Sequence, residues 1–153
     1  MSESEVTDDY AVYEPDWDDG EEFPPEIDEG INLNLIDILG TEEMRPRLWR
    51  FQPDQQLSYH YHREQEELFY MVEGTLHFRV GPPDAIEEVE VSEGMFFKPG
   101  TRTPRQLFNP TDEEAVCLIV GAPNVFEGQL WSEYDDDDTP AEGAEFIGLD
   151  EAL

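Results

Sequence analysis

Between Gly30 and Gly121, the chain consists of short apolar runs that are separated by turn-forming residues. Runs of this length, bounded by Gly, Pro, Asp and Asn, are typical of the strands in an all-β sandwich or barrel. The expected strands cover residues 31–39, 47–51, 57–62, 67–73, 75–80, 85–91, 95–97, 115–121 and 125–131. No long helix is expected. The sequence therefore predicts one all-β domain at residues 31–131, flanked by extensions at residues 1–30 and 132–153.

Two of the three histidines lie in one short segment, His60-Tyr61-His62. Because side chains alternate faces along a β-strand, His60 and His62 are expected on one face and Tyr61 on the other. Glu67 follows and opens the next predicted strand, which ends at Gly74. Two imidazoles and one carboxylate suit a divalent transition metal, and this set is usual for non-haem iron. The residues therefore predict a metal site at His60, His62 and Glu67.

The spacing of these residues resembles the first motif of the cupin family, which reads His-x-His, three or four residues, Glu, six residues, Gly. His60, His62, Glu67 and Gly74 fit this motif with a four-residue gap, whereas Glu66 would need a longer final spacer. The resemblance implies the cupin double-stranded β-helix, a small jelly-roll barrel. It also implies a homodimer, because cupin barrels commonly pair through their sheets.

The second cupin motif is matched only in part. Gly94 and Asn109 fit it, but Arg105 stands where the family has its last metal-binding histidine. A guanidinium is always charged and has no lone pair to donate to a metal. The resemblance therefore implies at most three of the family's four protein ligands. Two roles of Arg105 are open: it pairs with Glu67 and supplies the positive charge in place of a metal, or it points past a metal and binds a carboxylate or phosphate of a substrate.

These alternatives lead to two hypotheses for one small-molecule site inside the barrel. In the first, an Fe, Mn or Zn ion coordinates a small, anionic organic substrate for oxygenation or isomerisation, and Arg105 and Glu67 are the candidate catalytic residues. In the second, the protein is a non-catalytic, metal-free cupin that binds a small ligand or a partner protein in regulation or storage. The sequence leaves open whether the protein is an enzyme. No nucleotide cofactor is expected, because no phosphate-binding glycine loop is present.

The chain is strongly acidic, with 39 Asp and Glu against 8 Lys and Arg, and its formal net charge is −31. This charge repels a nucleic-acid backbone, so nucleic-acid partners are not expected. It would also strain a compact state at ordinary ionic strength, whereas near 1 M salt the Debye length falls to about 3 Å. The composition, which includes a single lysine, resembles that of proteins from salt-in halophilic microbes; two acidic tails are the plainer explanation.

Counting the charges by segment shows that most of the excess lies in the two tails but that the folded part is acidic too, which favours the halophile interpretation. Residues 1–30 carry 13 acids and residues 132–153 carry 9, with no bases in either, while residues 31–131 hold 17 acids and 8 bases. High charge without periodicity predicts a largely disordered arm at residues 1–30, although its aromatic residues indicate that part of it packs on the barrel or on a partner subunit. Asp135 to Asp138 are expected to be solvated charge rather than a calcium site.

The remaining sequence features predict the cellular compartment of the protein and the residues of its core. Cys117 is the single cysteine and is expected in the core, and no stretch approaches eighteen apolar residues, so a cytoplasmic protein without a membrane span is expected. His77 is expected to be structural and Trp49 to serve sheet packing or a subunit interface. The other predicted core residues are Phe69, Met71, Phe78, Phe96, Phe97, Leu107 and Phe108.

Overall fold

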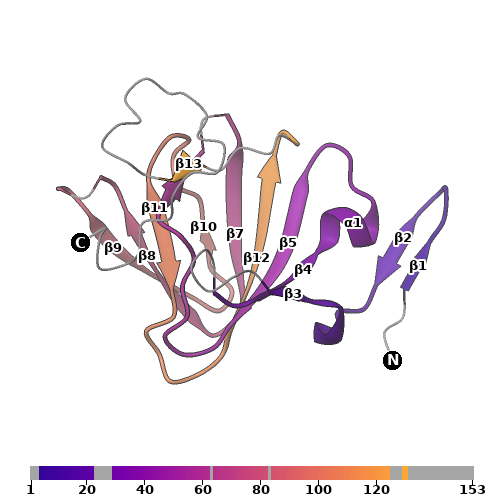
Figure 1. Ribbon diagram of the computed structural model, residues 1–153, viewed down its shortest axis with the longest axis horizontal. Helices are drawn as coiled ribbons and strands as arrows, with labels where there is room; N and C mark the ends of the chain where they lie inside the picture. Colours follow the sequence, from indigo (N-terminus) through magenta and orange to yellow (C-terminus); the bar gives the residue numbers. More distant parts are fainter. Residues whose placement is uncertain (1–3, 23–28, 63, 83, 125–128, 131–153) are drawn as a thin grey trace.

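Two antiparallel sheets make up most of the protein in a computed structural model, which describes residues 4–22, 29–62, 64–82, 84–124 and 129–130 (Figure 1). The first sheet has six strands in the order β10-β7-β12-β5-β4-β3. These strands are β3 (Glu21–Glu22), β4 (Ile31–Asn34), β5 (Arg45–Phe51), β7 (Glu66–Glu73), β10 (Phe96–Phe97) and β12 (Ala115–Ala122). Every pairing in this sheet is antiparallel, so an all-β fold agrees with the prediction from short, turn-bounded runs.

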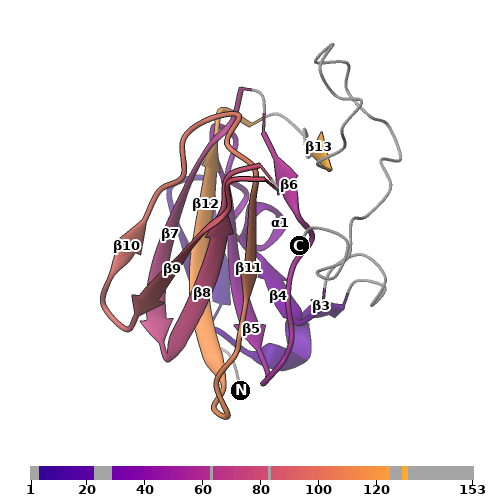
Figure 2. The same ribbon diagram turned by 90° about the vertical axis from the view of Figure 1, so that its left-hand side faces the viewer.

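The second sheet has five strands in the order β13-β6-β11-β8-β9, and it faces the first sheet across the core (Figure 2). Its strands are β6 (His60–Tyr61), β8 (Thr75–Val80), β9 (Glu87–Ser92), β11 (Arg105–Phe108) and β13 (Gln129–Leu130). From β5 to β13 the chain crosses between the two sheets after every strand except β8, which is followed by β9 in the same sheet. Such crossing is typical of a jelly roll. Of the strand predicted at residues 125–131, only β13 lies within the described residues.

One end of the space between the sheets is filled by an apolar core. Trp49 and Phe51 stack with ring centroids 5.5 Å apart, and Phe69 meets Phe78 edge to face at 5.0 Å. Trp49 is only 5% exposed, so its role is core packing. Cys117 is fully buried as predicted, and burial raises the pKa of its thiol to about 12. On β7 the apolar core begins at Phe69, two residues after Glu67.

Two local expectations were wrong. The strand predicted at residues 31–39 ends at Asn34, and a short helix, α1 (Leu35–Leu39), follows. Asn34 caps this helix by accepting from the Asp37 backbone N–H, and Gly40 ends it in the left-handed conformation with φ 72°. Phe96 is 65% exposed rather than part of the core, because it lies on the outer face and packs against Tyr70.

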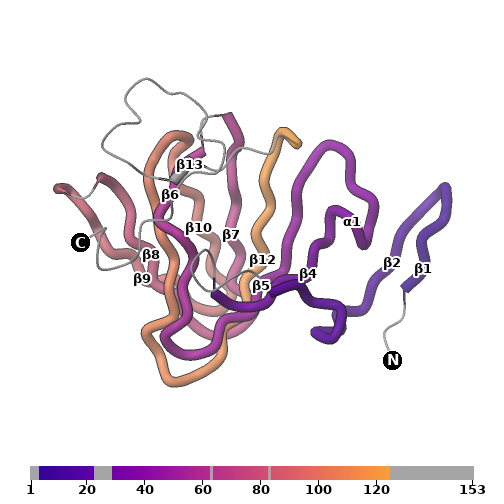
Figure 3. Tube along the Cα trace, viewed as in Figure 1, coloured from indigo at the N-terminus to yellow at the C-terminus, as the bar shows by residue number. Residues whose placement is uncertain are grey.

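The N-terminal segment is more ordered than its composition predicts. Residues 4–22 contain β1 (Ser4–Val6), β2 (Ala11–Tyr13), a 3-10 turn at Trp17–Asp19 and β3. The β1–β2 hairpin extends to one side beyond α1 (Figure 3), while β3 pairs with β4. Trp17 also stacks on the Arg50 guanidinium at 4.7 Å. These contacts agree with the expectation that part of the arm packs on the barrel, while the largely disordered character of the arm and its boundary at residue 30 stay predictions. No helix among the described residues is long and apolar enough to cross a membrane.

Candidate metal and anion site

His60 and His62 meet at the polar end of the barrel, at and just after strand β6. Their ring centroids lie 5.0 Å apart and the rings are nearly perpendicular, at 84°. His60 Nδ1 lies 2.9 Å from the Ser58 carbonyl oxygen, which can only accept a hydrogen bond. Nδ1 therefore carries the proton, and Nε2 keeps its lone pair. This contact fixes the ring in the tautomer whose Nε2 can bind a metal, because the Ser58 carbonyl holds the proton on the other ring nitrogen.

Glu67 reaches the histidines from the facing sheet, near the start of β7. Its Oε1 atom lies 3.2 Å from His62 Nε2 and 2.8 Å from Arg105 Nη2, and its side chain is only 13% exposed. The neighbouring Glu66 is exposed and lies 3.4 Å from Lys98, away from this cluster. Strand alternation thus separates the two glutamates as the motif spacing had indicated.

Arg105 closes the cluster from β11, where it pairs with His60 in the strand register. The residue is only 2% exposed. Besides the Glu67 contact, its Nη1 donates to the Thr103 carbonyl at 2.9 Å. Its Nε is buried without a hydrogen-bond partner among the described residues. A buried charged donor without an acceptor is costly, so this N–H is a place where a ligand acceptor would be stabilising.

The electrostatics of the cluster keep His60 and Glu67 in their metal-binding forms. Burial, together with the neighbouring His62 and the Arg105 charge, lowers the pKa of His60 to about 3, so the imidazole is neutral. Burial raises the pKa of Glu67, but the His62 contact and the Arg105 charge outweigh it and hold that pKa well below its usual value. A neutral imidazole and an ionised carboxylate are the forms that bind metals.

The donor set fits a divalent transition metal. One ligand atom from each of His60, His62 and Glu67 can be chosen so that all three lie within 4.8 Å of one another. Each ligand atom would lie about 2.1 Å from a bound ion. Two such atoms can therefore be at most about 4.2 Å apart, which is twice that distance. Closing that gap takes side-chain movements of about half an ångström. The three residues could thus hold an ion after a small adjustment, with Arg105 beside it.

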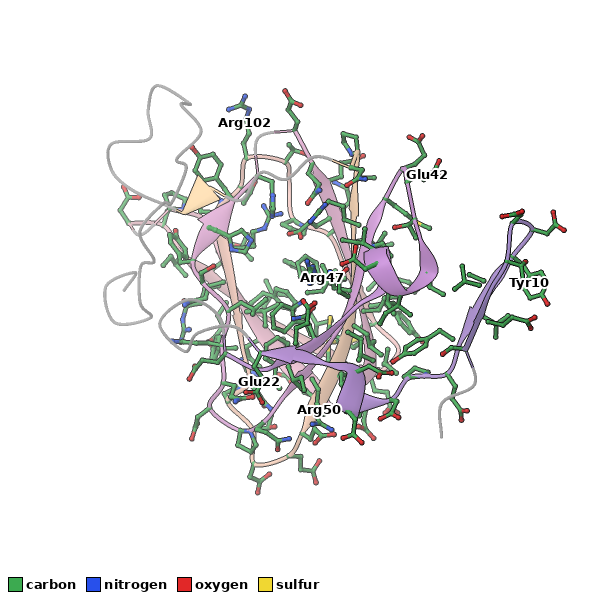
Figure 4. The ribbon with its side chains drawn as sticks, turned by 45° about the vertical axis from the view of Figure 1, so that its right-hand side comes forward. Tyr10, Glu22, Glu42, Arg47, Arg50 and Arg102 are labelled. Atoms are coloured by element: carbon green, nitrogen blue, oxygen red, sulfur yellow. The ribbon has the colours of Figure 1, made fainter. Side chains whose placement is uncertain are left out.

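Other polar residues take separate positions. Arg102 is exposed at the rim of the barrel (Figure 4), and its backbone N–H donates to the His62 carbonyl at 2.7 Å. Gln106 is buried but follows Arg105 in the strand, so it points to the opposite face. His77 lies on β8, outside the cluster, 3.8 Å from Glu88 and edge-on to Phe108. It does not join the other two histidines.

Sequence reasoning missed two polar residues that lie near the cluster, Gln65 just before β7 and Arg47 on β5. Gln65 is 4% exposed and donates to the Pro123 carbonyl at 3.1 Å, and its amide occupies the space that a side chain at Gly121 would need. Arg47 also faces the interior. Its alternation with Trp49 and Phe51 along β5 was the available signal.

Comparison with known proteins identifies what this arrangement resembles. Residues 47–121 match the family model described as "Cupin domain". A sugar phosphate isomerase of the cupin superfamily from Silicibacter pomeroyi has a similar structure, with a TM-score of 0.63 and 23% identity over 88% of this chain and 92% of that one. No curated protein sequence matches the chain.

Two further solved structures share the fold at lower coverage. A candidate sugar phosphate isomerase from Acidithiobacillus ferrooxidans gives a TM-score of 0.58 and 22% identity over 65% of this chain. The chain spans only 62% of that protein. A recombinant oxalate oxidase in complex with glycolate gives a TM-score of 0.57 and 18% identity over 70% of this chain and 56% of that one. At these identities the likeness shows the fold alone.

Proposed function

Because this chain belongs to the cupin superfamily, with its cupin domain at residues 47–121, we propose that it binds a divalent transition metal and a small anionic organic molecule inside the barrel. The ion is iron, manganese or zinc, held by His60, His62 and Glu67. The single observation that carries the proposal is this cluster, in which the Ser58 carbonyl fixes the proton of His60 on Nδ1 and leaves Nε2 free to coordinate.

Each residue has a distinct part in the proposed chemistry. When bound, the metal would supply open coordination positions and Lewis acidity for an isomerisation or an oxygenation. His60 and His62 supply nitrogen ligands, and Glu67 supplies the negatively charged one. Arg105 orients the anionic group of the substrate, because its Nε–H points into a buried environment without an acceptor and its charge is permanent.

The names of the similar proteins suggest which ligands to test first. Two of them are named as a sugar phosphate isomerase or a candidate for one, and a third is an oxalate oxidase with bound glycolate. Both classes of small molecule carry an anionic group that a guanidinium can bind. Sugar phosphates and small carboxylates are therefore the ligand classes of this proposal.

Metal analysis tests the metal part directly. Protein purified without chelator is compared with a His60→Ala, His62→Ala double variant and with a His77→Gln control, which changes the histidine outside the cluster. We expect close to one equivalent of metal in the wild type and in the His77→Gln variant, and almost none in the double variant. Equal, near-zero metal in all three proteins would remove the proposal.

A second candidate function follows from the contact between Arg105 and Glu67. Their atoms lie 2.8 Å apart, and a guanidinium beside the carboxylate can neutralise it as a metal would. In this alternative the protein is a non-catalytic cupin that binds a small ligand or a partner protein without metal. It predicts ligand binding that chelators do not change. Loss of ligand binding on removal of a metal, with recovery when the metal returns, would exclude it.

The expected homodimer stays a prediction, and the outer face of the first sheet gives it a location to test. Leu68, Val72 and Phe96 are 43%, 45% and 65% exposed on β7 and β10. Exposed apolar side chains that gather on one face often mark a protein interface. A Phe96→Ser variant should shift sedimentation from dimer to monomer, whereas a wild type that sediments as a monomer would rule out the dimer.

A further inference from the structure

The β1–β2 hairpin projects from the body of the protein and exposes an apolar face. Tyr10 and Val12 lie two residues apart and therefore share one face, where they are 51% and 54% exposed. The opposite face carries the half-buried Ala11 and Tyr13 and turns toward α1, although Val6 near the tip stays exposed. Figure 4 shows Tyr10 on this hairpin, away from the barrel. A two-stranded hairpin is only marginally stable in water, so its exposed apolar face favours a partner.

The chain that follows the hairpin is fixed to the outer side of the first sheet. Arg50 comes directly after the core residue Trp49 in β5, so its side chain points away from the core. Trp17 stacks on this guanidinium at 4.7 Å, and the Tyr13 hydroxyl donates to the Asp19 carboxylate at 2.9 Å. The hairpin therefore leaves the outer side of the first sheet in a set direction.

The same outer side carries an apolar patch near the opposite edge of the sheet. Leu68 and Val72 on β7 and Phe96 on β10 are 43%, 45% and 65% exposed. Phe96 packs on Tyr70, its partner in the strand register, with ring centroids 4.7 Å apart. These four residues form the β7–β10 patch.

Within one chain, the hairpin lies too far from this patch to cover it. In the strand order of the first sheet, β10 and β4 are four strand spacings apart, which is about 19 Å. The hairpin lies still further out, beyond α1 (Figure 1). Two chains that pack through these outer faces about a twofold axis parallel to the strands would place each hairpin over the β10 edge of the other. Each contact then occurs twice, and the dimer is closed.

Charge complementarity favours a second copy of this chain as the occupant of the patch. The tip of the hairpin carries the exposed Asp8 and Asp9, and the Thr7 hydroxyl holds this turn by accepting from the Asp9 backbone N–H at 3.2 Å. Beside the patch lies Lys98, the single lysine of the chain, whose side chain is 48% exposed and 3.4 Å from Glu66. An apolar surface with a cation beside it is complementary to an apolar hairpin with an acidic tip.

We infer that the β1–β2 hairpin is an exchanged dimer arm: its Tyr10 and Val12 side chains pack on the β7–β10 patch of a second copy of this chain, and its acidic tip meets the partner's Lys98. This inference rests on the homodimer of the proposed function and adds the segment that each chain gives to the other. The arm and the patch are different surfaces of one chain, so each chain supplies one of each.

Sedimentation equilibrium in about 1 M KCl, which screens the repulsion between two acidic chains, tests this inference with three variants. The Tyr10→Ser, Val12→Ser variant changes the arm, and Phe96→Ser changes the patch. Met44→Ser is the matched control, because this apolar side chain is 45% exposed and belongs to neither surface. We expect the arm and patch variants each to raise the dimer dissociation constant by about 10-fold or more, as truncation of interface aromatic residues does, and the control to leave it unchanged.

Mixing the arm variant with the patch variant distinguishes an exchanged arm from a symmetric contact of patch with patch. In a mixed dimer, the intact arm of the Phe96→Ser chain meets the intact patch of the arm variant. One of the two contacts is thereby restored, whereas a dimer of either variant alone has neither contact intact. We expect the mixture to dimerise more tightly than each variant by itself. Unfolded variants would not restore each other, so this result does not depend on assumptions about folding.

The possible contrary results separate the arm from the dimer. A wild type that sediments as a monomer would remove the dimer and the arm together. An arm variant that dimerises as tightly as the wild type, or a mixture that gains nothing over the separate variants, would overturn the arm and leave the dimer in place. Metal content of the same samples tests the metal site independently, because His60, His62 and Glu67 belong to neither surface.

Discussion

The outer surface and the polar end of the barrel interior differ in how their charges are balanced. The chain has 39 acids and 8 bases, and most acids of the described residues are exposed. Inside, the largely buried Glu67 carboxylate lies 2.8 Å from the buried Arg105 guanidinium, so each charge has its counter-charge beside it. The surface charge acts through water and responds to salt, whereas each interior charge depends on one or two neighbours. The difference shows that the acidity of the composition describes the surface and says little about the site.

The largest change in the free energy of unfolding should come from salt, which screens the surface charges. Like charges about 4 Å apart cost about 1 kcal/mol per pair in water, so screening several such pairs should stabilise the fold by a sum on the order of 5 kcal/mol. We expect the free energy of unfolding in urea to rise strongly between 0.1 and 2 M KCl. Equal osmolality of a neutral osmolyte serves as the control, and a stability that does not depend on KCl would contradict the proposed halophilic character.

Among changes inside the barrel, removing one partner of the Arg105–Glu67 pair should cause the largest loss of stability. The Arg105→Leu variant leaves the Glu67 carboxylate largely buried without its cation, which costs about 3–5 kcal/mol. The Arg105→Leu, Glu67→Leu double variant should recover most of this loss, because it removes both charges. Urea unfolding of metal-free protein measures both variants. If the double variant were as unstable as the single one, the pair would not be coupled.

Acid should destabilise the metal-free protein through His60. Its pKa is about 3 in the folded state against an ordinary value of 6.5, so below pH 6.5 the unfolded chain takes up a proton that the folded one excludes. Stability therefore falls as the pH drops, by at most about 2 kcal/mol at pH 5, since the ring is only partly buried. Below pH 4.5 the depressed pKa of Glu67 adds a loss of the same sign.

Unfolding measured from pH 7.5 to pH 5 checks this prediction. The His60→Gln variant should flatten the curve between pH 6.5 and pH 5, while His77→Gln should leave its shape unchanged. A wild-type curve that is already flat in this range would show that His60 is accessible to protons in the folded state.

The smallest of these effects should come from Asn32→Ala. The variant removes one buried hydrogen bond to Arg47 and one to the Glu21 carbonyl, and we expect it to cost about 1 kcal/mol of stability. Metal content should stay unchanged, because Asn32 lies outside the His60, His62 and Glu67 cluster. Urea unfolding measures the loss, and a loss as large as that of Arg105→Leu would show that Asn32 supports more of the fold than these two hydrogen bonds.

The sequence predicted the parts of this site that depend on local geometry. His60, His62 and Glu67 could be grouped from alternation along strands and from motif spacing alone, and the preference for Glu67 over Glu66 came from the same spacing. Arg47 was missed because its place depends on the order β7-β12-β5, in which strands distant along the chain become neighbours. The N-terminal strands were missed for a similar reason, since β3 is held by pairing with β4 and not by its own composition.

Anomalous X-ray diffraction from crystals grown with Mn(II) tests the central claim most directly. We predict an anomalous peak about 2.0–2.3 Å from His60 Nε2, with a nitrogen of His62 and an oxygen of Glu67 at similar distances and Arg105 beside the ion. No peak between the two imidazoles, with Arg105 and Glu67 still in direct contact there, would contradict the account.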